Sequence, residues 1–424
     1  MKKWIALLLA LLLTLTACGK KAPQAGVAQA ETGPGRVCYL NSRPELKEVL
    51  QTLADAYTAE TGTEVQILTP EPGTYRRTLA SRMTSAEAPT IFTVSDLSEL
   101  LDWENHARNL TGTALEAELL APDLGLYNKA GELKALGCSY ESFGLIVNTT
   151  LLEQAGFSLE DIRNFETLQT VVESINVRSA DLGFLPFAPS GLAASGYLVS
   201  LPLYYAGVTG QEPTISGEYL ELLRNFWDLY LYNSLPNLPE LTESTPAEAL
   251  EWFREGLAVF YPGSSGEYAL LRESGMTDEQ LTMIPLFCGA EGEENTALCS
   301  GTDAFWVVNA RVRPEDQQAS MDFLLWLVSD AEASARYAEQ TGGLPFRSAA
   351  PSSNKFLEDG MELVNQGKIP IPWTYHLAPN ADSWRATVTT ALKAYTADPT
   401  DKAWDEVVKS FTEGWAYEYQ FANS

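Results

Sequence analysis

The chain has 424 residues, of which 28 are basic and 56 acidic, so its formal net charge at pH 7 is −28. This acidic excess repels phosphate backbones and anionic lipid, and therefore argues against nucleic-acid binding and against membrane adsorption by charge. With 45% hydrophobic and 10% aromatic residues the chain is globular rather than disordered, and its length predicts two or three domains.

The amino terminus has the pattern of a secretory signal peptide. Lys2 and Lys3 precede an apolar stretch of about a dozen residues, which is too short to span a membrane. Leu15-Thr16-Ala17-Cys18 resembles the bacterial lipobox, in which the cysteine is diacylated and becomes the first mature residue. We therefore expect a signal peptide at 1–17 and a lipid anchor (palmitate) on Cys18. An ordinary secretory signal with a chance cysteine is the alternative.

The segment that follows, 18–35, is rich in Gly, Ala, Pro and Gln and is expected to be a flexible tether. No later stretch reaches transmembrane length, so the prediction is a soluble body held at the extracytoplasmic face of the bacterial membrane. Removal of Lys2 and Lys3 with the signal peptide takes the formal charge to about −30.

Four further cysteines are present, and an export compartment permits disulfides. Cys288 and Cys299 flank a turn rich in Gly and Glu at 289–295 and could face each other across a hairpin. Two buried free thiols are the alternative. Cys38 and Cys138 lie in separate candidate strands, so only the fold could bring them together.

The first third of the mature chain alternates strands and helices. Strands are expected at 36–41, 64–68 and 90–94, and helices at 44–61 and 75–85. This β-α-β-α-β order predicts a mostly parallel, doubly wound α/β sheet.

Ligands bind such sheets outside the carboxyl ends of the strands. Asn41 to Arg43 and Ser95-Asp96 follow two of these strands and are therefore candidates for the rim of a site. Helix capping alone is the alternative role of Ser95 and Asp96.

The remainder of the chain is rich in helices. Helical periodicity is found at 165–177, 218–232, 246–255, 266–273, 315–328, 383–395 and 400–415. Apolar strands are expected at 257–261, which ends at a Pro-Gly turn, and at 304–309.

Motifs for catalysis and cofactor binding are absent from the sequence. There is no G-x-x-x-x-G-K-[ST] loop, no G-x-S-x-G elbow, no H-E-x-x-H and no EF-hand loop. Only two histidines are present, which disfavours histidine-rich metal sites, and neither His106 nor His376 lies in a motif for a catalytic triad. We therefore expect no enzyme activity, no cofactor and no metal.

Aromatic residues grouped with polar ones remain as the candidate site. Sugar rings pack on aromatic planes and bond to carboxylates, hydroxyls and guanidinium groups, and organic cations use aromatic faces and carboxylates. The alternative is that these aromatics belong to the core. The candidate ligand-binding residues are Asn41, Arg43, Asp96, Glu141, Tyr261, Ser264, Asp303, Trp373 and Trp384.

Several segments, in this order along the chain, resemble one family. They are the lipobox, Cys38-Tyr39-Leu40-Asn41, 56–65, Pro89-Thr90-Ile91-Phe92, Ser142-Phe143-Gly144-Leu145-Ile146-Val147-Asn148, Glu255-Gly256-Leu257-Ala258-Val259-Phe260 and Asp322-Phe323-Leu324-Leu325-Trp326-Leu327. The chain resembles extracellular solute-binding lipoproteins of ABC transporters, in the carbohydrate-binding group related to maltose-binding protein.

The resemblance implies a two-lobed periplasmic-binding-protein-like fold of type II, with discontinuous lobes joined by crossing strands. Lobe 1 would comprise 36–143 plus 300–346, and lobe 2 would comprise 144–299 plus 347–424. The crossings are expected near 142–148, 298–303 and 344–348.

The resemblance also implies a function. A monomeric protein would capture a sugar or oligosaccharide by hinge closure and deliver it to a permease that is driven by a separate ATPase. The same fold binding a polyamine or another organic cation is the alternative, and a surface glycosidase is a remote one.

One departure from the family concerns the sugar platform. Relatives often carry aromatic residues just before a Leu-Pro-x-Tyr element, whereas here Leu192-Ala193-Ala194 precedes Leu201-Pro202-Leu203-Tyr204. We therefore expect this platform to be absent, which disfavours long maltodextrin-like ligands.

Overall fold

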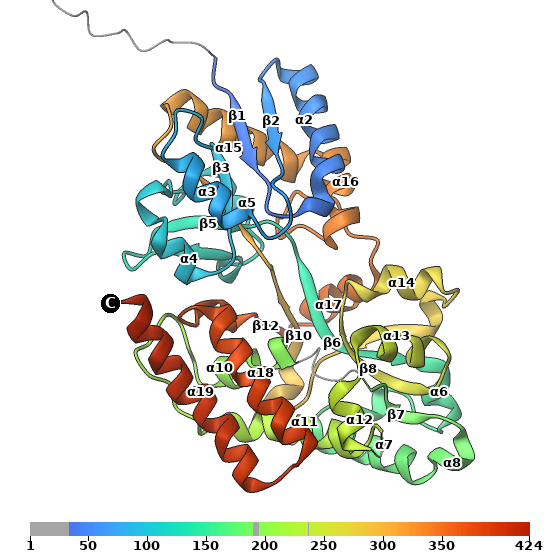
Figure 1. Ribbon diagram of the computed structural model, residues 1–424. Helices are drawn as coiled ribbons and strands as arrows, with labels where there is room; N and C mark the ends of the chain where they lie inside the picture. Colours follow the sequence, from blue (N-terminus) through green and yellow to red (C-terminus); the bar gives the residue numbers. More distant parts are fainter. Residues whose placement is uncertain (1–33, 190–194, 236) are drawn as a thin grey trace, which may run out of the picture. The chain divides into compact units, whose positions relative to one another are not determined.

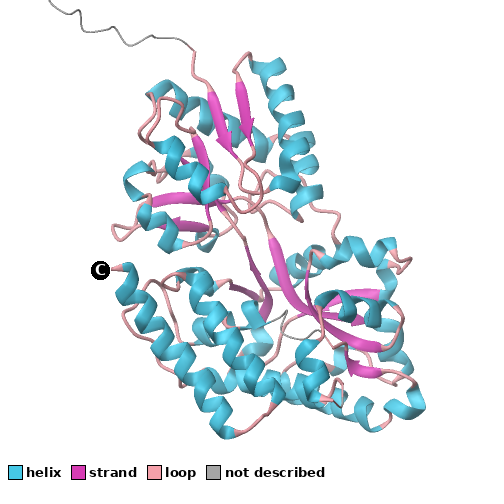
Figure 2. Cartoon of the chain, in the orientation of Figure 1, coloured by secondary structure: helices cyan, strands magenta, loops and turns pink. Residues whose placement is uncertain are grey.

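The strands of this protein form two separate sheets (Figures 1 and 2). The computed structural model describes residues 34–189, 195–235 and 237–424. The strands are β1 (Val37–Leu40), β2 (Val65–Leu68), β3 (Ile91–Val94), β4 (Gly125–Tyr127), β5 (Leu133–Gly137), β6 (Glu141–Asn148), β7 (Leu185–Phe187), β8 (Ala258–Ser264), β9 (Leu281–Ile284), β10 (Thr296–Gly301), β11 (Phe305–Val308) and β12 (Ile369–Pro372).

Helices surround both sheets. The α-helices are α2 (Lys47–Thr61), α3 (Tyr75–Met83), α4 (Leu97–Asp102), α5 (Ala114–Glu118), α6 (Thr149–Gln154), α7 (Phe165–Val177), α8 (Ser179–Leu182), α9 (Ser195–Leu198), α10 (Ser200–Tyr205), α11 (Leu220–Tyr232), α12 (Leu238–Glu243), α13 (Pro246–Arg254), α14 (Glu267–Glu273), α15 (Pro314–Ser329), α16 (Ala331–Thr341), α17 (Lys355–Asn365), α18 (Ala381–Ala397) and α19 (Asp401–Ala422). The 3-10 helices are η1 (Pro44–Leu46), η2 (Glu104–His106), η3 (Pro122–Leu124), η4 (Leu159–Asp161), η5 (Asp278–Gln280), η6 (Glu293–Asn295) and η7 (Thr374–Leu377).

Gly35–Ser424 forms one compact unit. The signal peptide 1–17, Cys18 and all but the last two residues of the tether 18–35 lie outside the described residues. Within the described part, no helix combines the length and the apolar character needed to cross a membrane.

The first sheet has the strand order β2-β1-β3-β11-β5-β4 and, with its helices, forms the first lobe. β1 is parallel to β2 and β3, as the β-α-β-α-β pattern predicts. β11 is antiparallel to both β3 and β5, so the sheet is mixed rather than mostly parallel. The reason is that β11 enters from the second lobe rather than through a crossover helix of the first.

The second sheet has the order β12-β10-β6-β8-β7, with β9 also paired to β6, and its helices complete the second lobe. β8 extends the strand predicted at 257–261 through Pro262 to Ser264. β7 pairs with β8 only as far as Phe260, so Pro262 lies where that edge of β8 has no partner strand among the described residues. Proline is tolerated at such an edge because it has no backbone N–H to pair.

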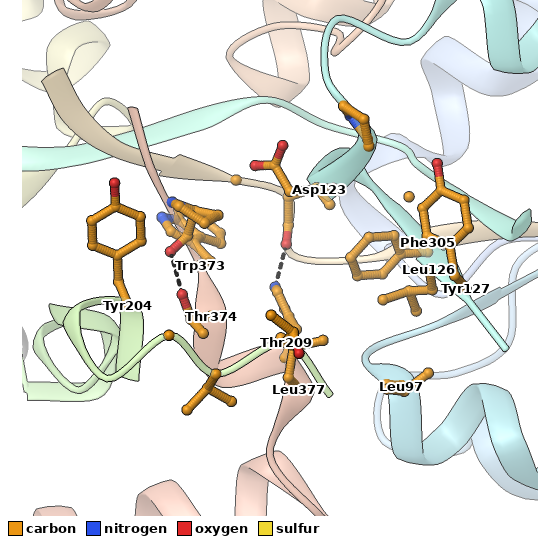
Figure 3. A pocket seen from close by; sticks show the side chains of 18 residues that line it. Leu97, Asp123, Leu126, Tyr127, Tyr204, Thr209, Phe305, Trp373, Thr374 and Leu377 are labelled. Carbon is orange, nitrogen blue, oxygen red and sulfur yellow. Dashed lines mark hydrogen bonds between the residues drawn. The ribbon is translucent and has the colours of Figure 1, made fainter. Parts of the chain in front are cut away.

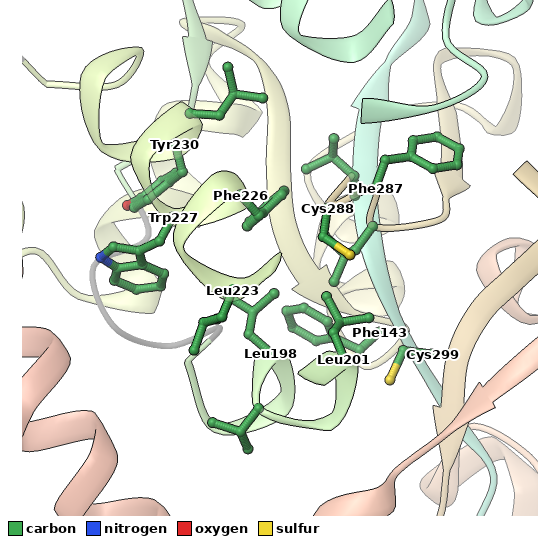
Figure 4. Packing of buried hydrophobic residues seen from close by; sticks show 14 of the residues in the cluster. Phe143, Leu198, Leu201, Leu223, Phe226, Trp227, Tyr230, Phe287, Cys288 and Cys299 are labelled. Carbon is green, nitrogen blue, oxygen red and sulfur yellow. The ribbon is translucent and has the colours of Figure 1, made fainter. Parts of the chain in front are cut away.

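Helix α7 shows how the sequence directs this packing. Its bounds, Phe165–Val177, are those predicted, and the Asn164 side chain accepts the backbone N–H of Thr167 in a capping box. The buried face comprises Leu168, Val171, Val172 and Ile175, which recur every three or four residues. This face contributes to the large apolar cluster of the second lobe, part of which is shown in Figure 4.

Two chain segments lead from one sheet to the other. β5 continues into β6 through residues 138–140, and β10 continues into β11 through residues 302–304. We call these segments the two connectors. A third passage, in the region predicted at 344–348, forms no strand and is anchored to the first lobe by a bridge between Leu119 and Phe346.

The two connectors lie side by side. The backbone N–H of Cys138 donates to Ala304 O at 3.0 Å, and the Ser139 hydroxyl donates to Asp303 Oδ1 at 2.6 Å. Because these bonds join the only two strand-to-strand passages in the described part of the chain, the passages act as one unit.

The disulfide considered between Cys288 and Cys299 is not formed. Both thiols are free and buried, as are those of Cys38 and Cys138, and the first two lie in the apolar cluster of Figure 4. β9 and β10 are not a hairpin, because both pair antiparallel with β6, one along 145–148 and the other along 141–143.

A carboxylate holds the loop between β9 and β10 instead. Glu293 is only 3% exposed and accepts the backbone N–H groups of Cys288 (2.6 Å), Gly289 (2.8 Å) and Phe165 at the start of α7 (2.6 Å).

Two aromatic residues predicted to contact ligand belong to the core. Trp384 is 0% exposed, donates Nε1–H to Phe411 O at 2.9 Å and packs edge-on against Trp415 with a centroid separation of 5.2 Å. Tyr261 is 1% exposed and packs against Phe253. The prediction of ligand contact is therefore wrong for Trp384 and Tyr261. Both have polar neighbours in the sequence, but both rings are buried in the core.

The free thiols yield a first prediction. In guanidinium chloride without reductant, residues 35–424 should react with Ellman's reagent at Cys38, Cys138, Cys288 and Cys299, since all four are unpaired. The folded protein should react slowly because the thiols are buried. Two reactive thiols instead of four would show that a disulfide does form.

Trp384 yields a second prediction. Trp384→Ala should lower the free energy of unfolding by about 3–5 kcal/mol, because it empties a fully buried site. Urea denaturation measures this change. Tyr417→Ala is the control, because its side chain is 66% exposed and its loss should change stability by no more than about 0.5 kcal/mol. Near-native stability of Trp384→Ala would contradict the core assignment.

Candidate functional site

The carboxyl ends of β1 and β3 bring the two predicted rim segments together. Asn41 is 1% exposed, and its side-chain amide donates to Arg43 O (2.6 Å) and to Thr69 Oγ1 (3.1 Å), while its Oδ1 accepts the Arg43 N–H (3.0 Å). All of these bonds are internal. Asn41 therefore shapes the turn that presents Arg43 rather than offering its own side chain to a ligand.

Arg43 lies in a polar cavity of about 430 Å³. Its guanidinium group pairs with Glu45 (2.8 Å) and with Asp303 of the second connector (3.2 Å). The lining of this polar cavity is Ser42, Arg43, Gly73, Tyr75, Arg76, Thr93, Val94, Ser95, Glu99, Asp303, Ala304 and Asp382. Most of these residues come from the first lobe, but Asp382 belongs to α18 of the second.

Glu141, at the start of β6, is a carboxyl group without a hydrogen-bond or ion-pair partner among the described residues. Burial raises its pKa to about 7, the negative charges of Asp303 and Glu267 add to the shift, and Arg43 opposes it. Glu141 pairs with Gly301 across β6 and β10, close to the Arg43–Asp303 pair and to Glu267 of α14. It is therefore a free acceptor or donor for a polar ligand.

On the second-lobe side, Ser264 supports Glu267 rather than standing free. The Ser264 backbone N–H and hydroxyl donate to Glu267 Oε2 at 2.8 and 2.7 Å, and the Tyr261 hydroxyl also bonds to this carboxylate. Burial raises the pKa of Glu267. The β8–α14 turn thus holds a carboxylate close to Glu141.

Tyr197 supplies an aromatic plane that the sequence analysis missed. The expected absence of a platform was based on Leu192-Ala193-Ala194, which lie outside the described residues. Tyr197 of α9 stacks on Phe143 at a centroid separation of 4.9 Å and lies equally close to Trp373. Burial, followed by the charge of Glu141, raises the pKa of Tyr197 to about 12, while Arg385 opposes the shift.

Arg385 forms the second-lobe counterpart of Arg43. Its guanidinium carbon lies 4.0 Å from the centroid of the Tyr375 ring, and it donates to Asp382 Oδ1 at 2.9 Å. Its Nε is buried and has no partner among the described residues. Arg76 of the first lobe pairs with Glu99 at 3.4 Å, so each of the three arginines around this cleft has a carboxylate beside it.

A second, more apolar cavity of about 460 Å³ is also lined by a residue of the second connector, Thr302 (Figure 3). Trp373 lines it although it is only 3% exposed, with Nε1–H donating to Cys299 O at 3.1 Å. His376 contacts Thr302 O at 2.6 Å, and burial lowers its pKa to about 4. The wall facing them includes Leu97, Leu126, Tyr127 and Phe305.

Asp96 functions as a helix cap. Its Oδ1 accepts the Glu99 N–H at 2.9 Å at the start of α4, which is the alternative role named for it from sequence. Burial, with Glu99 and Asp382 adding to it, raises its pKa to about 6. Asp96 does not line the polar cavity but lies in a neighbouring one.

The structure thus gathers only part of the predicted set. Arg43, Glu141 and Asp303 lie together, and Trp373 faces the apolar cavity. The contributors that sequence reasoning left out are Tyr75, Arg76, Tyr197, Glu267 and Arg385. Arg385 could have been named as a candidate from the sequence, because it directly follows the aromatic residue Trp384. No feature of the sequence marks Tyr197 in this way. No cluster of three His, Cys, Asp or Glu side chains suited to a metal ion is found in the described part of the chain.

Glu141 yields a third prediction. Its folded-state pKa of about 7 exceeds the ordinary 4.5, so the folded state holds this proton more tightly and Glu141 lowers stability as the pH rises from 4.5 to 7. Glu141→Gln should therefore raise the free energy of unfolding at pH 8 by about 2–3 kcal/mol. At pH 4 the change should be small, because the carboxyl group is then mostly protonated in both the folded and the unfolded state.

Urea denaturation at pH 4 and pH 8 measures this effect. Glu332→Gln is the control, since its side chain is 84% exposed and the change should be within about 0.5 kcal/mol at either pH. Equal effects of Glu141→Gln at both pH values would contradict the assignment.

Comparison with known proteins identifies a matching family and several similar structures. Residues 52–363 match the family described as bacterial extracellular solute-binding protein. Apo RafE from Streptococcus pneumoniae has a TM-score of 0.69 and 12% identity, and the match covers 92% of this chain and 100% of that one. A family 1 extracellular solute-binding protein from Bifidobacterium longum subsp. infantis has a TM-score of 0.70 and 14% identity, with 91% and 100% covered.

A sugar transporter protein from Bacillus licheniformis, solved with stachyose, has a TM-score of 0.62 and 15% identity, with 90% and 100% covered. A comparison with curated sequences finds no match. The structural likenesses establish the two-lobed fold, and the family match spans well over half of the sequence. This chain therefore belongs to the bacterial extracellular solute-binding protein family.

Proposed function

We propose that this protein is the substrate-binding component of an ABC importer, and that it captures a sugar or oligosaccharide between its lobes. The observation that carries the proposal is the cleft around Arg43, Glu141 and Tyr197. It combines an aromatic plane with guanidinium and carboxylate groups, which suits the apolar face and the hydroxyls of a sugar ring.

Charge balance favours a neutral ligand over an organic cation. Arg43, Arg76 and Arg385 each have a carboxylate partner, so the charges of Asp303, Glu99 and Asp382 are balanced within the cleft. A polyamine would be held by unpaired carboxylates, and close to Arg43 the described cleft offers two that have no cation partner, Glu141 and Glu267. A polyhydroxylated ligand can bond to paired and unpaired groups alike.

Proteins of similar structure also support a sugar as the ligand. RafE has been solved in complex with raffinose, and the Bacillus licheniformis protein in complex with stachyose. Both share the two-lobed fold with this chain at low sequence identity. Binding without catalysis fits the family, and the sequence contains no catalytic motif.

The proposed mechanism is hinge closure. The lobes, 36–143 plus 300–346 and 144–299 plus 347–424, would rotate about the paired connectors and enclose the sugar. The closed monomer would then dock on a permease that is driven by a separate ATPase, since the sequence has no nucleotide-binding loop. A lipid on Cys18 would hold the protein at the outer face of the membrane.

Isothermal titration calorimetry with mono- to tetrasaccharides tests the proposal. We expect heat from at least one carbohydrate, with an affinity that hardly changes with salt. A ligand of cationic type would bind more weakly as ionic strength rises, because its charges are screened. No heat from any sugar would refute the carbohydrate assignment, and turnover of a chromogenic glycoside would favour the glycosidase.

Arg43 yields a fourth prediction. Arg43→Ala should weaken the binding of the sugar that gives heat by about 10- to 100-fold, because a charged hydrogen bond to the ligand is lost. Arg254→Ala is the control, since Arg254 pairs with Glu251 on α13 away from the cavities. Melting without sugar checks that both variants fold. An unchanged Kd for Arg43→Ala would contradict the placement of the site.

A further inference from the structure

A third cavity, of about 400 Å³, adjoins the polar cavity, and we call it the outer cavity. Its lining is Arg76, Asp96, Ser98, Glu99, Asp102, Trp103, Asn380, Phe421 and Ala422. Arg76 and Glu99 line both the outer and the polar cavity, so the two spaces meet at this ion pair. A ligand that leaves the polar cavity past Arg76 enters the outer one.

Two aromatic side chains from different lobes line the outer cavity. Trp103 follows α4 of the first lobe and is braced edge-on by Phe92 and by His106. Phe421 lies in the last turn of α19, at the carboxyl-terminal end of the chain (Figure 1). Phe421 is 67% exposed, so most of its ring is not covered by any described part of the chain.

Three of the side chains that line the outer cavity are carboxylates, namely Asp96, Glu99 and Asp102. Asp102 is exposed, and Asp96 Oδ2 accepts only a long bond of 3.3 Å, from the Ser95 hydroxyl. Carboxylate oxygens accept hydrogen bonds from sugar hydroxyls, and such charge-assisted bonds are the stronger kind. The outer cavity therefore has the same combination of aromatic and acceptor groups as the polar cavity.

The second-lobe wall is held in a strained backbone conformation. Asn380 has φ of 46°, the only positive φ of a non-glycine residue among those described. Its side-chain amide donates to Glu418 Oε2 of α19 at 2.7 Å, and this carboxylate also accepts the Ser383 hydroxyl. Such strain persists only where surrounding contacts enforce it. These bonds fix the start of α18 against the last turns of α19, close to Phe421.

Access between the two cavities is only weakly restricted. Arg76 Nη2 lies 3.9 Å from Asp382 Oδ2, and both side chains are more than half exposed. Exposed ion pairs of this kind contribute little free energy, so a ligand can displace this one at small cost.

From these observations we infer that the outer cavity is a second sugar subsite, where Trp103 and Phe421 hold the distal ring of an oligosaccharide of three or more units. The inference rests on the proposed function and specifies its substrate class. Each cavity by itself has the volume of a small-molecule site, so their connection provides more room than one monosaccharide fills. The platform expected to be missing near 192–194 belongs to another part of the chain and does not bear on this subsite.

Calorimetry with the mature chain and a graded series tests the inference. The probes are sucrose, raffinose and stachyose, and in parallel maltose, maltotriose and maltotetraose. Phe421→Ala should weaken the binding of the longer members by about tenfold, the effect of losing a contact of about 1.4 kcal/mol, and leave the disaccharides unchanged. Phe421→Trp should restore the affinity for the longer members, because it retains an aromatic face.

Tyr417→Ala is the matched control. Tyr417 lies one turn earlier on α19, is 66% exposed like Phe421 and does not line the outer cavity, so its loss should not change any Kd. Equal affinities of the parent and Phe421→Ala for every chain length would overturn the subsite, as would an equal loss for disaccharides and longer sugars. Absence of heat from every carbohydrate would instead refute the proposed function, so the two failures are distinguishable.

Discussion

The pairing of the two connectors is the constraint on which the rest of the structure depends. The hydrogen bonds from Cys138 to Ala304 and from Ser139 to Asp303 join two strands that each pass from one sheet to the other. Because β6 begins directly after the first connector and β11 directly after the second, these bonds set the positions of both sheets. They also set the positions of Glu141 and Asp303, two carboxyl groups that follow directly on the connectors or lie within them.

Ion pairs around the cleft change what the net negative charge of the chain implies about its ligand. A formal charge of −28 would suggest an acidic funnel for cations, yet Arg43, Arg76 and Arg385 each lie beside a carboxylate. Much of the negative charge around the cleft is therefore balanced by these arginines. Within the cleft, Glu141 is a half-buried carboxyl whose pKa is raised to about 7, so near neutral pH it can donate as well as accept a hydrogen bond.

Local sequence signals predicted individual elements well and the site only in part. The 3.6-residue periodicity of α7 predicted the bounds of this helix, because it depends on neighbours within one or two turns, and the structure adds the Asn164 cap at its start. Trp384 and Tyr261 were wrongly placed in the site, since an aromatic residue beside polar ones looks the same whether its ring faces the core or a cleft. Tyr197 was missed because no nearby motif marks it, and only the fold brings it onto Phe143.

The sequence by itself determined the α/β class, the family resemblance and the order of the elements, because periodicity, capping and turn residues act over short distances along the chain. The tertiary structure alone decided which residues share the cleft. Arg43 and Asp303 are 260 positions apart, and Trp103 and Phe421 come from different lobes, so their proximity depends on how the sheets are joined. It also decided that Cys288 and Cys299 remain apart, since whether two consecutive strands form a hairpin or follow one another along a common partner depends on sheet pairing.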